Sequence, residues 1–251
     1  MAQSELESQV REDLAAALRW ASRLGYGEGI CNHFSAEIPP SNLEPRADRG
    51  GRFLINPQGL HWSEVMPDDL VVVDAHGRKV SGKHTVEPTA FFIHGAVHRG
   101  KPQAKCVLHT HMPYATALTS IEGGRLEWAS QNALKFYGRV AYDNDYNGLA
   151  LDDAEGERMC AQLAQADVLF LGNHGIIVTG QTIGTSFDDL YYLERACMLQ
   201  VLAMSTGRPL RIVPEAVAAK TGKQMAEDSA QAELHFAALK RLLDRDEPAW
   251  R

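Results

Sequence analysis

Two histidines, His109 and His111, stand one residue apart at the end of the apolar segment CVLHTH. This segment is typical of a buried strand, whose successive side chains point to opposite faces, so both imidazoles point the same way, about 6–7 Å apart. A third histidine, His174, lies in the segment LGNHGI, where two glycines allow a sharp turn. Three neutral nitrogen ligands with an open fourth position are typical of a catalytic metal site, and zinc, iron or manganese suits such ligands.

The sequence leaves other interpretations of its histidines open. A bare His-x-His pair also occurs among ordinary core or surface histidines. His94 and His98 form a rival pair, because residues four apart on a helix face the same side and helical histidine pairs can bind metal. We expect a packing role for this second pair, or a role that supports the ligands from behind.

The segments around these residues mix helices and strands without a strict strand–helix–strand repeat. Helices are expected at residues 6–24, 89–100, 152–165, 185–207 and 226–245, and strands within residues 27–40, 53–62, 70–80, 106–111 and 168–180. Residues 41–52 are expected to form a polar loop. This mixture predicts an α/β fold with a mostly antiparallel or mixed sheet and helices packed on its faces.

Length and composition narrow the class of protein. The 251 residues, 45% of them hydrophobic, predict one domain over residues 1–251. The net charge of -7 and the scattered Lys and Arg argue against nucleic-acid binding, and no apolar run reaches the ~18 residues of a membrane span. The four cysteines form no CxxC pair and the N-terminus lacks the apolar core of a signal peptide, so we expect a cytoplasmic protein with free thiols.

Four segments of the chain resemble the class II aldolase/adducin family: CNHFS at residues 31–35, FLINPQG at 53–59, KPQAKCVLHTH at 101–111 and GNHG at 172–175. The last two are specific and the first two are supportive. The resemblance covers roughly residues 10–205 and leaves 206–251 as a C-terminal helical extension. The family includes fuculose-phosphate and rhamnulose-phosphate aldolases, a ribulose-phosphate epimerase, aromatic and pyridine carboxylate decarboxylases, and the non-catalytic head of adducin.

The resemblance implies a three-layer α/β/α domain and a homotetramer with active sites near the subunit interfaces. It also implies that His109, His111 and His174 hold a divalent ion that acts on a small-molecule substrate. That ion is zinc in the aldolases, with manganese or iron(II) as alternatives. Adducin heads lack the complete histidine set, so its presence here favours an enzyme, although the CNHFS segment is similar to adducin.

The resemblance transfers less directly to the acid or base. The sugar-phosphate aldolases carry Ser-Ser-Glu before the helix that precedes the His-x-His strand. This chain has SGKHTVEP there, with Glu87 as its one carboxylate, a few residues further upstream. Glu87 is therefore a candidate acid, base or fourth ligand, and the simpler interpretation is a helix-start glutamate stabilised by the helix dipole. Tyr192 is a second catalytic candidate, with core packing as its alternative.

The substrate class follows from what the chain lacks. The paired serines that bind phosphate in the aldolases are missing, which leaves Asn32 and the turn at Gly59 as candidate substrate-binding groups. Lys83 and His84 are an alternative source of an anion contact. Because backbone amides at a glycine turn bind carboxylate as well as phosphate, we expect a small, unphosphorylated, carboxylated substrate.

These features favour a divalent-metal-dependent carbon–carbon lyase, either a decarboxylase or an aldolase. In both reactions bond cleavage leaves an electron pair beside a carbonyl or an electron-poor ring, and a metal chelated by the substrate stabilises the enolate-like intermediate. The alternatives are a sugar-phosphate aldolase or epimerase, a non-catalytic binding module like the adducin head, and an iron-dependent oxygenase. Metal content separates the enzyme from the binding module, and oxygen consumption identifies the oxygenase.

Overall fold

The computed structural model of the chain describes residues 3–39 and 51–251. Within these ranges, eight strands form one sheet in the order β4-β3-β2-β1-β5-β8-β7-β6. Neighbouring strands are antiparallel except β6 and β7, which are parallel, so the predicted mostly antiparallel, mixed sheet is confirmed. The strands are β1 (His33–Glu37), β2 (Arg52–Ile55), β3 (Val71–Asp74), β4 (Lys79–Ser81), β5 (Cys106–Thr110), β6 (Val140–Asp143), β7 (Val168–Leu171) and β8 (Gly175–Gly180).

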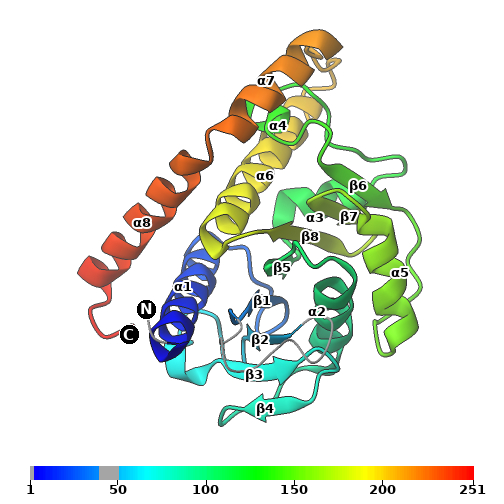
Figure 1. The fold of residues 1–251 in the computed structure, drawn as a ribbon. Coiled ribbons are helices and arrows are strands. Elements are labelled where there is room, and N and C mark those ends of the chain that lie inside the picture. The colour runs from blue at the N-terminus through cyan, green and yellow to red at the C-terminus, as the bar shows by residue number, and fades with distance from the viewer. Residues whose placement is uncertain (1–2, 40–50) are drawn as a thin grey trace.

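Helices cover both faces of this sheet, as Figure 1 shows. One face packs against α1 (Gln3–Arg23), α3 (Pro113–Thr119) and α6 (Ile183–Met204), and the other against α2 (Pro88–Gly100) and α5 (Asp153–Leu163). The other helices described are α4 (Gln131–Leu134), α7 (Glu215–Glu227), α8 (Ser229–Asp246) and a 3-10 turn, η1 (Pro67–Asp69). These layers confirm the expected three-layer α/β/α fold.

Strands β1 and β5 decide which side chains reach the α2 side of the sheet. Leu108 on β5 and Phe34 on β1 both belong to the core beneath α1 and α6, whereas Val107 belongs to the core beneath α2 and α5. Because successive strand residues alternate between faces, His109 and His33 lie on the α2 side. The antiparallel register of β1 and β5 places these two histidines directly opposite each other.

The start of α2 is fixed by its first residues. Pro88 occupies the first turn, where its missing N–H is not needed. Glu87 is the N-cap residue, and its side chain accepts a hydrogen bond from the backbone N–H of Ala90 at 3.0 Å. The helix start therefore holds the Glu87 carboxylate at the edge of the sheet.

The structure contains elements that the sequence patterns did not predict. These are α3, α4, α7, β6 and the short η1. Helix α4 has four residues, which is too short for a periodic pattern to be recognised. Most side chains of α7 are exposed, so its apolar face is narrow. The polar loop predicted at residues 41–52 lies mostly outside the described residues.

The C-terminal helix α8 lies along α1 and α6 (Figure 1). The indole N–H of Trp20 on α1 donates a hydrogen bond to the carbonyl of Leu239 on α8 at 2.8 Å. Arg23 pairs with Glu247 at 2.5 Å, and Trp250 beyond the helix is buried. These contacts attach the C-terminal extension to the first helix. None of the helices described has the length and apolar character that a membrane span requires.

Candidate metal centre

The structure brings the three predicted ligand histidines together at one end of the sheet. His109 lies at the end of β5, His111 just beyond it, and His174 in the turn between β7 and β8. The ring centroids of His109 and His111 are 5.2 Å apart, and each is 4.9 Å from that of His174. One nitrogen from each ring lies within 4.8 Å of the other two. Residues distant in sequence thus form one compact cluster.

Hydrogen bonds on the outer nitrogens orient two of these rings. Nδ1–H of His109 donates to the carbonyl oxygen of Ile176 at 2.9 Å. Nδ1 of His111 bonds to the carboxylate of Glu28. Each bond leaves Nε2 as the nitrogen with a free lone pair, which is the usual arrangement when a carbonyl or carboxylate supports a metal-ligating histidine.

Burial keeps two of the rings neutral. The pKa of His109 is held well below its ordinary value by burial and by the neighbouring His174 and His111. Burial, followed by the charge of His111, lowers the pKa of His174 to about 4. Neutral imidazoles present lone pairs, so both rings are ready to bind a cation at neutral pH.

A close approach of two chain segments explains Gly175 in the GNHG motif. A Cβ atom at this position would lie 2.5 Å from the carbonyl oxygen of Thr110 and 2.7 Å from Cδ2 of His111. Asn173 adopts a positive φ of 55°, and its N–H donates to the carbonyl of Thr119 at 3.0 Å. The turn can therefore bring His174 against His111 because Gly175 has no side chain.

The three histidines fit a divalent ion. Zn–N bonds of about 2.0–2.1 Å in a tetrahedral site would place ligand nitrogens roughly 3.4 Å apart, and the three nitrogens here lie within 4.8 Å of one another. Nε2 of His111 is buried and has no hydrogen-bond partner among the described atoms, as a nitrogen reserved for a ligand would be. No carboxylate joins the three-nitrogen cluster within the described ranges, so a bound ion keeps open positions.

Glu87 reaches this centre through His33. Its Oε2 accepts hydrogen bonds from the hydroxyl of Thr89, from the N–H of Ala90 at 3.0 Å and from Nε2–H of His33 at 3.2 Å. The ring of His33 stacks on that of His109, with centroids 6.2 Å apart. Among the contacts described, the other carboxylate oxygen, Oε1, has no partner. One oxygen therefore anchors Glu87 and the second remains open.

These contacts keep Glu87 ionised. Burial raises the pKa of Glu87. The hydrogen bonds from His33, Thr89 and the backbone of Ala90 together lower it by more than burial raises it, so the pKa falls to about 2. The helix-start role weighed from sequence is present, because this carboxylate caps α2. A role in the reaction stays a prediction, supported by the contact with His33.

Asn32, predicted to bind substrate, contacts the backbone of His111 just beyond β5. Its side-chain oxygen accepts a hydrogen bond from the backbone N–H of His111 at 3.2 Å. Its backbone has a positive φ of 73°, and its carbonyl accepts a hydrogen bond from Nδ2 of Asn56 at 3.3 Å. These contacts show that Asn32 helps to place His111. A substrate contact of Asn32 stays a prediction.

Gly59, the other predicted substrate-binding residue, lies in a turn joined to the loop before α2. It has a φ of 88°, which favours glycine. The N–H of Gln58 in this turn donates to the carbonyl of Thr85 at 2.9 Å. The turn thus lies near Glu87, and its proposed contact with substrate is untested.

Lys83 and His84, the alternative anion contacts, are engaged elsewhere. Nζ of Lys83 lies 2.7 Å from Oδ1 of Asp69, and Nε2 of His84 lies 3.3 Å from the same oxygen. Asp69 belongs to η1. Both side chains therefore contact Asp69, and neither replaces the missing serines without rearrangement.

Two tyrosines differ in their distance from the histidine cluster. The ring of Tyr192 lies under Nζ of Lys135 at 5.1 Å and near His235, and no contact described joins it to the three histidines. The ring of Tyr146 lies 6.2 Å from that of His174, and its side chain is half exposed. Helix α6 carries Tyr192 away from the turn it follows in sequence. Tyr146 is the tyrosine beside the cluster.

Sequence patterns missed three residues around the centre: Glu28, His33 and Tyr146. Glu28 is the one carboxylate in the stretch between α1 and Asn32. A single acidic residue beside the CNHFS segment is only a weak indication of a role in the site. His33 would follow from the alternation that identified His109, once the pairing of β1 with β5 is known. That pairing is non-local, so no pattern along the sequence indicates it.

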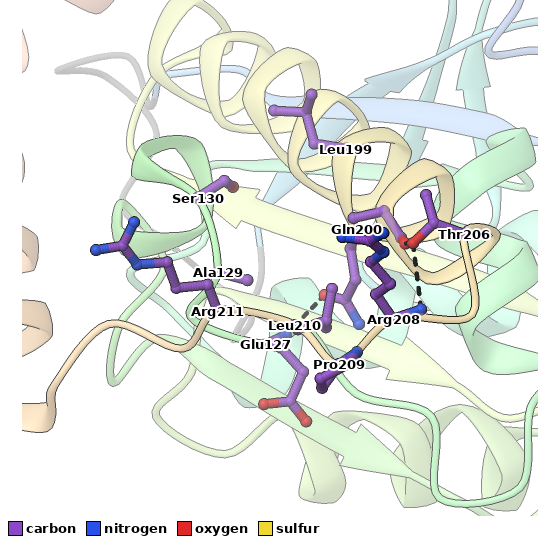
Figure 2. A pocket seen from close by; sticks show the side chains of 11 residues that line it. Glu127, Ala129, Ser130, Leu199, Gln200, Thr206, Arg208, Pro209, Leu210 and Arg211 are labelled. Atoms are coloured by element: carbon purple, nitrogen blue, oxygen red, sulfur yellow. Dashed lines mark hydrogen bonds between the residues drawn. The ribbon is translucent and has the colours of Figure 1, made fainter.

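A pocket of about 280 Å³ lies away from the histidine cluster, at the C-terminal end of α6 (Figure 2). Its lining includes Gln200, Arg208 and Arg211 together with the apolar Leu199 and Leu210. Neither the three histidines nor Glu87 lines it. This pocket therefore has no part in the candidate centre.

Comparison with known proteins adds family relationships to this geometry. Residues 12–201 match the model of the Class II Aldolase and Adducin N-terminal domain. The crystal structure of an aldolase II superfamily protein from Pseudomonas syringae superposes with a TM-score of 0.88 at 34% identity, covering 98% of this chain and 96% of that chain. An L-fuculose 1-phosphate aldolase from Glaciozyma antarctica PI12 gives a TM-score of 0.84 at 25% identity, covering 98% and 94%. The decarboxylase NovR from Streptomyces niveus is 30% identical over 233 residues, which are 90% of this chain and 83% of that protein.

Proposed function

The chain belongs to the class II aldolase and adducin family, and within that family we propose that it is a divalent-metal-dependent carbon–carbon lyase. Similar proteins carry the names decarboxylase and aldolase, and both activities break a carbon–carbon bond. The proposed substrate is a small, unphosphorylated carboxylate. The observation that carries this proposal is the cluster of His109, His111 and His174, with one nitrogen of each ring within 4.8 Å of the others.

The three histidines would hold the ion, with zinc proposed first and manganese or iron(II) as alternatives. When bound, such an ion supplies positive charge for the negative charge that develops on a substrate oxygen during bond cleavage. Glu28 and the carbonyl of Ile176 fix the orientation of two ligand rings in advance. This support reduces the reorganisation that binding requires.

Glu87 is the proposed proton acceptor. Its carboxylate is ionised at neutral pH, and Oε1 has no partner among the contacts described. A base at this edge can take the proton of a substrate hydroxyl, while His33 holds the other oxygen in place. Tyr146 beside His174 is the proposed donor of a proton to the new carbon–hydrogen bond. The proposed chemistry does not use Tyr192.

We also propose a homotetramer in the cytoplasm. Apolar side chains are exposed around the end of α6 and the start of α7, namely Leu199, Leu202, Met204, Ile212 and Val217. Exposed apolar residues gathered in one region are typical of surfaces that associate. Light scattering at micromolar concentration is expected to give the tetramer mass, and a monomer would contradict the proposal.

Metal content and turnover test the proposed function together. The wild-type protein is expected to hold one divalent ion per chain by elemental analysis, and the double variant His109→Ala/His111→Ala none. The matched control is His61→Ala/His76→Ala, which removes two exposed histidines and should retain the ion. The loaded wild type is then screened against hydroxy-substituted aromatic and pyridine carboxylates and sugar phosphates. Full metal in the double variant would refute the site, and metal binding without turnover would favour a binding module.

A further inference from the structure

A chain of buried polar groups crosses the layer between the sheet and α2. Oγ of Ser35 on β1 lies 2.6 Å from Nδ1 of His94 and 2.8 Å from Nε2 of His98. Nδ1 of His98 lies 3.1 Å from the carbonyl oxygen of Ala104. Ser35 and His94 are 0% exposed and His98 is 3% exposed, so bulk solvent does not reach these groups and their partners are the buried groups around them. The helical pair weighed as a rival metal site is thus joined by one serine hydroxyl.

The outer end of this chain determines the direction of every hydrogen bond in it. The carbonyl of Ala104 can only accept, so His98 carries its hydrogen on Nδ1. Burial lowers the pKa of His98 to about 4, so at neutral pH its Nε2 is bare and accepts from the Ser35 hydroxyl. The single hydrogen of Ser35 is then used, and His94 must donate to Ser35 from Nδ1. Burial also holds the pKa of His94 well below its ordinary value, so its Nε2 is bare.

At its inner end, this chain of hydrogen-bonded groups reaches His33 through the ring of His94. The rings of His94 and His33 are in edge contact, with centroids 6.0 Å apart and an interplanar angle of 87°. Nε2 of His94 is buried without a hydrogen-bond partner in the part of the chain that the structure describes. His33 in turn bonds to Glu87 and stacks on His109. The hydrogen-bonded groups therefore end against His33, the residue that connects Glu87 to the three histidines.

We propose that Ser35, His94 and His98 are positioning residues for the candidate metal centre and act through His33. Their hydrogen bonds fix the ring of His94, and this ring holds His33 in the one orientation that directs Nε2–H to Glu87. The inference rests on the proposed function, in which Glu87 is the base.

The energetics of buried hydrogen bonds support a positioning role for these three residues. Apolar groups of the same shape can replace a buried hydrogen-bonded pair at little or no cost, so attachment of α2 to the sheet does not require this polar chain. A buried network in which the hydrogen bonds depend on one another does specify one arrangement of its rings. The inner end of this network lies against His33, so the arrangement it specifies includes that ring.

Two variants of Ser35 test the proposal directly. Ser35→Ala removes the hydroxyl that joins the two rings, and Ser35→Thr keeps it on a residue that suits a strand. In protein labelled with 15N at histidine, the wild type should show His94 and His98 as neutral rings with hydrogen on Nδ1. Ser35→Ala is expected to broaden or split the imidazole signals of His33, and Ser35→Thr to restore them.

A control separates this effect from general loosening. Ser186 is a buried serine on α6, and its hydroxyl donates to the carbonyl of Thr182 at 2.7 Å. Ser186→Ala is expected to leave the His33 signals unchanged. If Ser35→Ala does not fold, Ser35→Cys takes its place, because a thiol is a weak donor of similar size and should give the same change at His33.

Turnover gives a second measurement. Ser35→Ala is expected to lower kcat about 10–100-fold, as loss of a supporting contact does at comparable sites, while KM and zinc affinity stay within about twofold. Unchanged His33 signals in Ser35→Ala, or hydrogen on Nε2 of His94 in the wild type, would overturn the proposal. The NMR measurement does not require activity. An inactive wild type would therefore count against the proposed function and leave the result on His33 valid.

Discussion

Nε2 of His33 lies 3.2 Å from Oε2 of Glu87, which joins strand β1 to the start of α2 at the edge of the histidine cluster. Because β1 is paired with β5, this contact places a helix-capping carboxylate beside the ligand strand. Oε2 makes both the N-cap hydrogen bond and the contact with His33, which leaves Oε1 for the proposed role as base. The structural role of Glu87 and its proposed catalytic role therefore fall on different oxygens.

The carboxylate of Glu28 is predicted to strengthen metal binding through His111. Glu28→Gln keeps the shape of the side chain but removes its charge, so the zinc affinity should fall about 10–100-fold. Competition with a chelator of known affinity measures the change. Glu227→Gln, at an exposed position on α7, is the matched control and should leave the affinity unchanged. An unaltered affinity in Glu28→Gln would remove Glu28 from the site.

The low pKa of Glu87 predicts a pH-dependent contribution to stability. Its pKa is about 2 when folded and 4.5 as the ordinary value, so the stabilisation is complete above pH 4.5 and is lost as the pH falls towards 2. Because the side chain is 32% exposed, we expect Glu87→Gln to lose roughly 1–2 kcal/mol at pH 7. Urea unfolding at fixed protein concentration should show this difference shrinking between pH 5 and pH 3. A difference independent of pH would contradict the assignment.

Gly175 is predicted to be required for the ligand turn. A methyl group there meets the backbone of Thr110 at 2.5 Å, so Gly175→Ala should destabilise the fold by about 1–3 kcal/mol and weaken zinc binding through His111 and His174. Gly207→Ala is the matched control, since its Cβ would meet open space at a φ of 70°. The control should lose about 1 kcal/mol from backbone strain alone and bind zinc normally. Normal zinc binding by Gly175→Ala would show that the turn tolerates a side chain.

Local patterns were sufficient to predict the parts of the site that depend on local structure. The alternation of a strand placed His109 and His111 on one face, and two glycines marked the turn that carries His174. The mixed sheet and the long helices were predictable for the same reason. A pattern of spacing along the chain is visible without knowledge of the fold.

The remaining parts depend on contacts between distant segments. His33 faces His109 through strand pairing, and no local pattern specifies that register. Tyr192 is close to His174 in sequence, but α6 places it near the side chains of Lys135 and His235, and its catalytic role stays a prediction. Tyr146 reaches His174 from another loop. Contacts of this kind require the three-dimensional arrangement of the chain.

The protein is predicted to prefer an unphosphorylated carboxylate to fuculose or rhamnulose phosphate. The loop before α2 lacks the paired serines, and the alternative anion contacts, Lys83 and His84, lie beside Asp69. A phosphate dianion would lose two hydrogen bonds, each worth about 1.5–3 kcal/mol to a charged group, and 1.4 kcal/mol corresponds to about tenfold in affinity. A carboxylate has fewer oxygens to satisfy, so the same loop penalises it less. The measurement is kcat/KM for both classes with the same metal on the same preparation, and Glu87→Gln serves as a control that should slow both. If a sugar phosphate exceeds every carboxylate tested by about a hundredfold or more, another group binds phosphate in place of the serines and the argument from this loop is wrong.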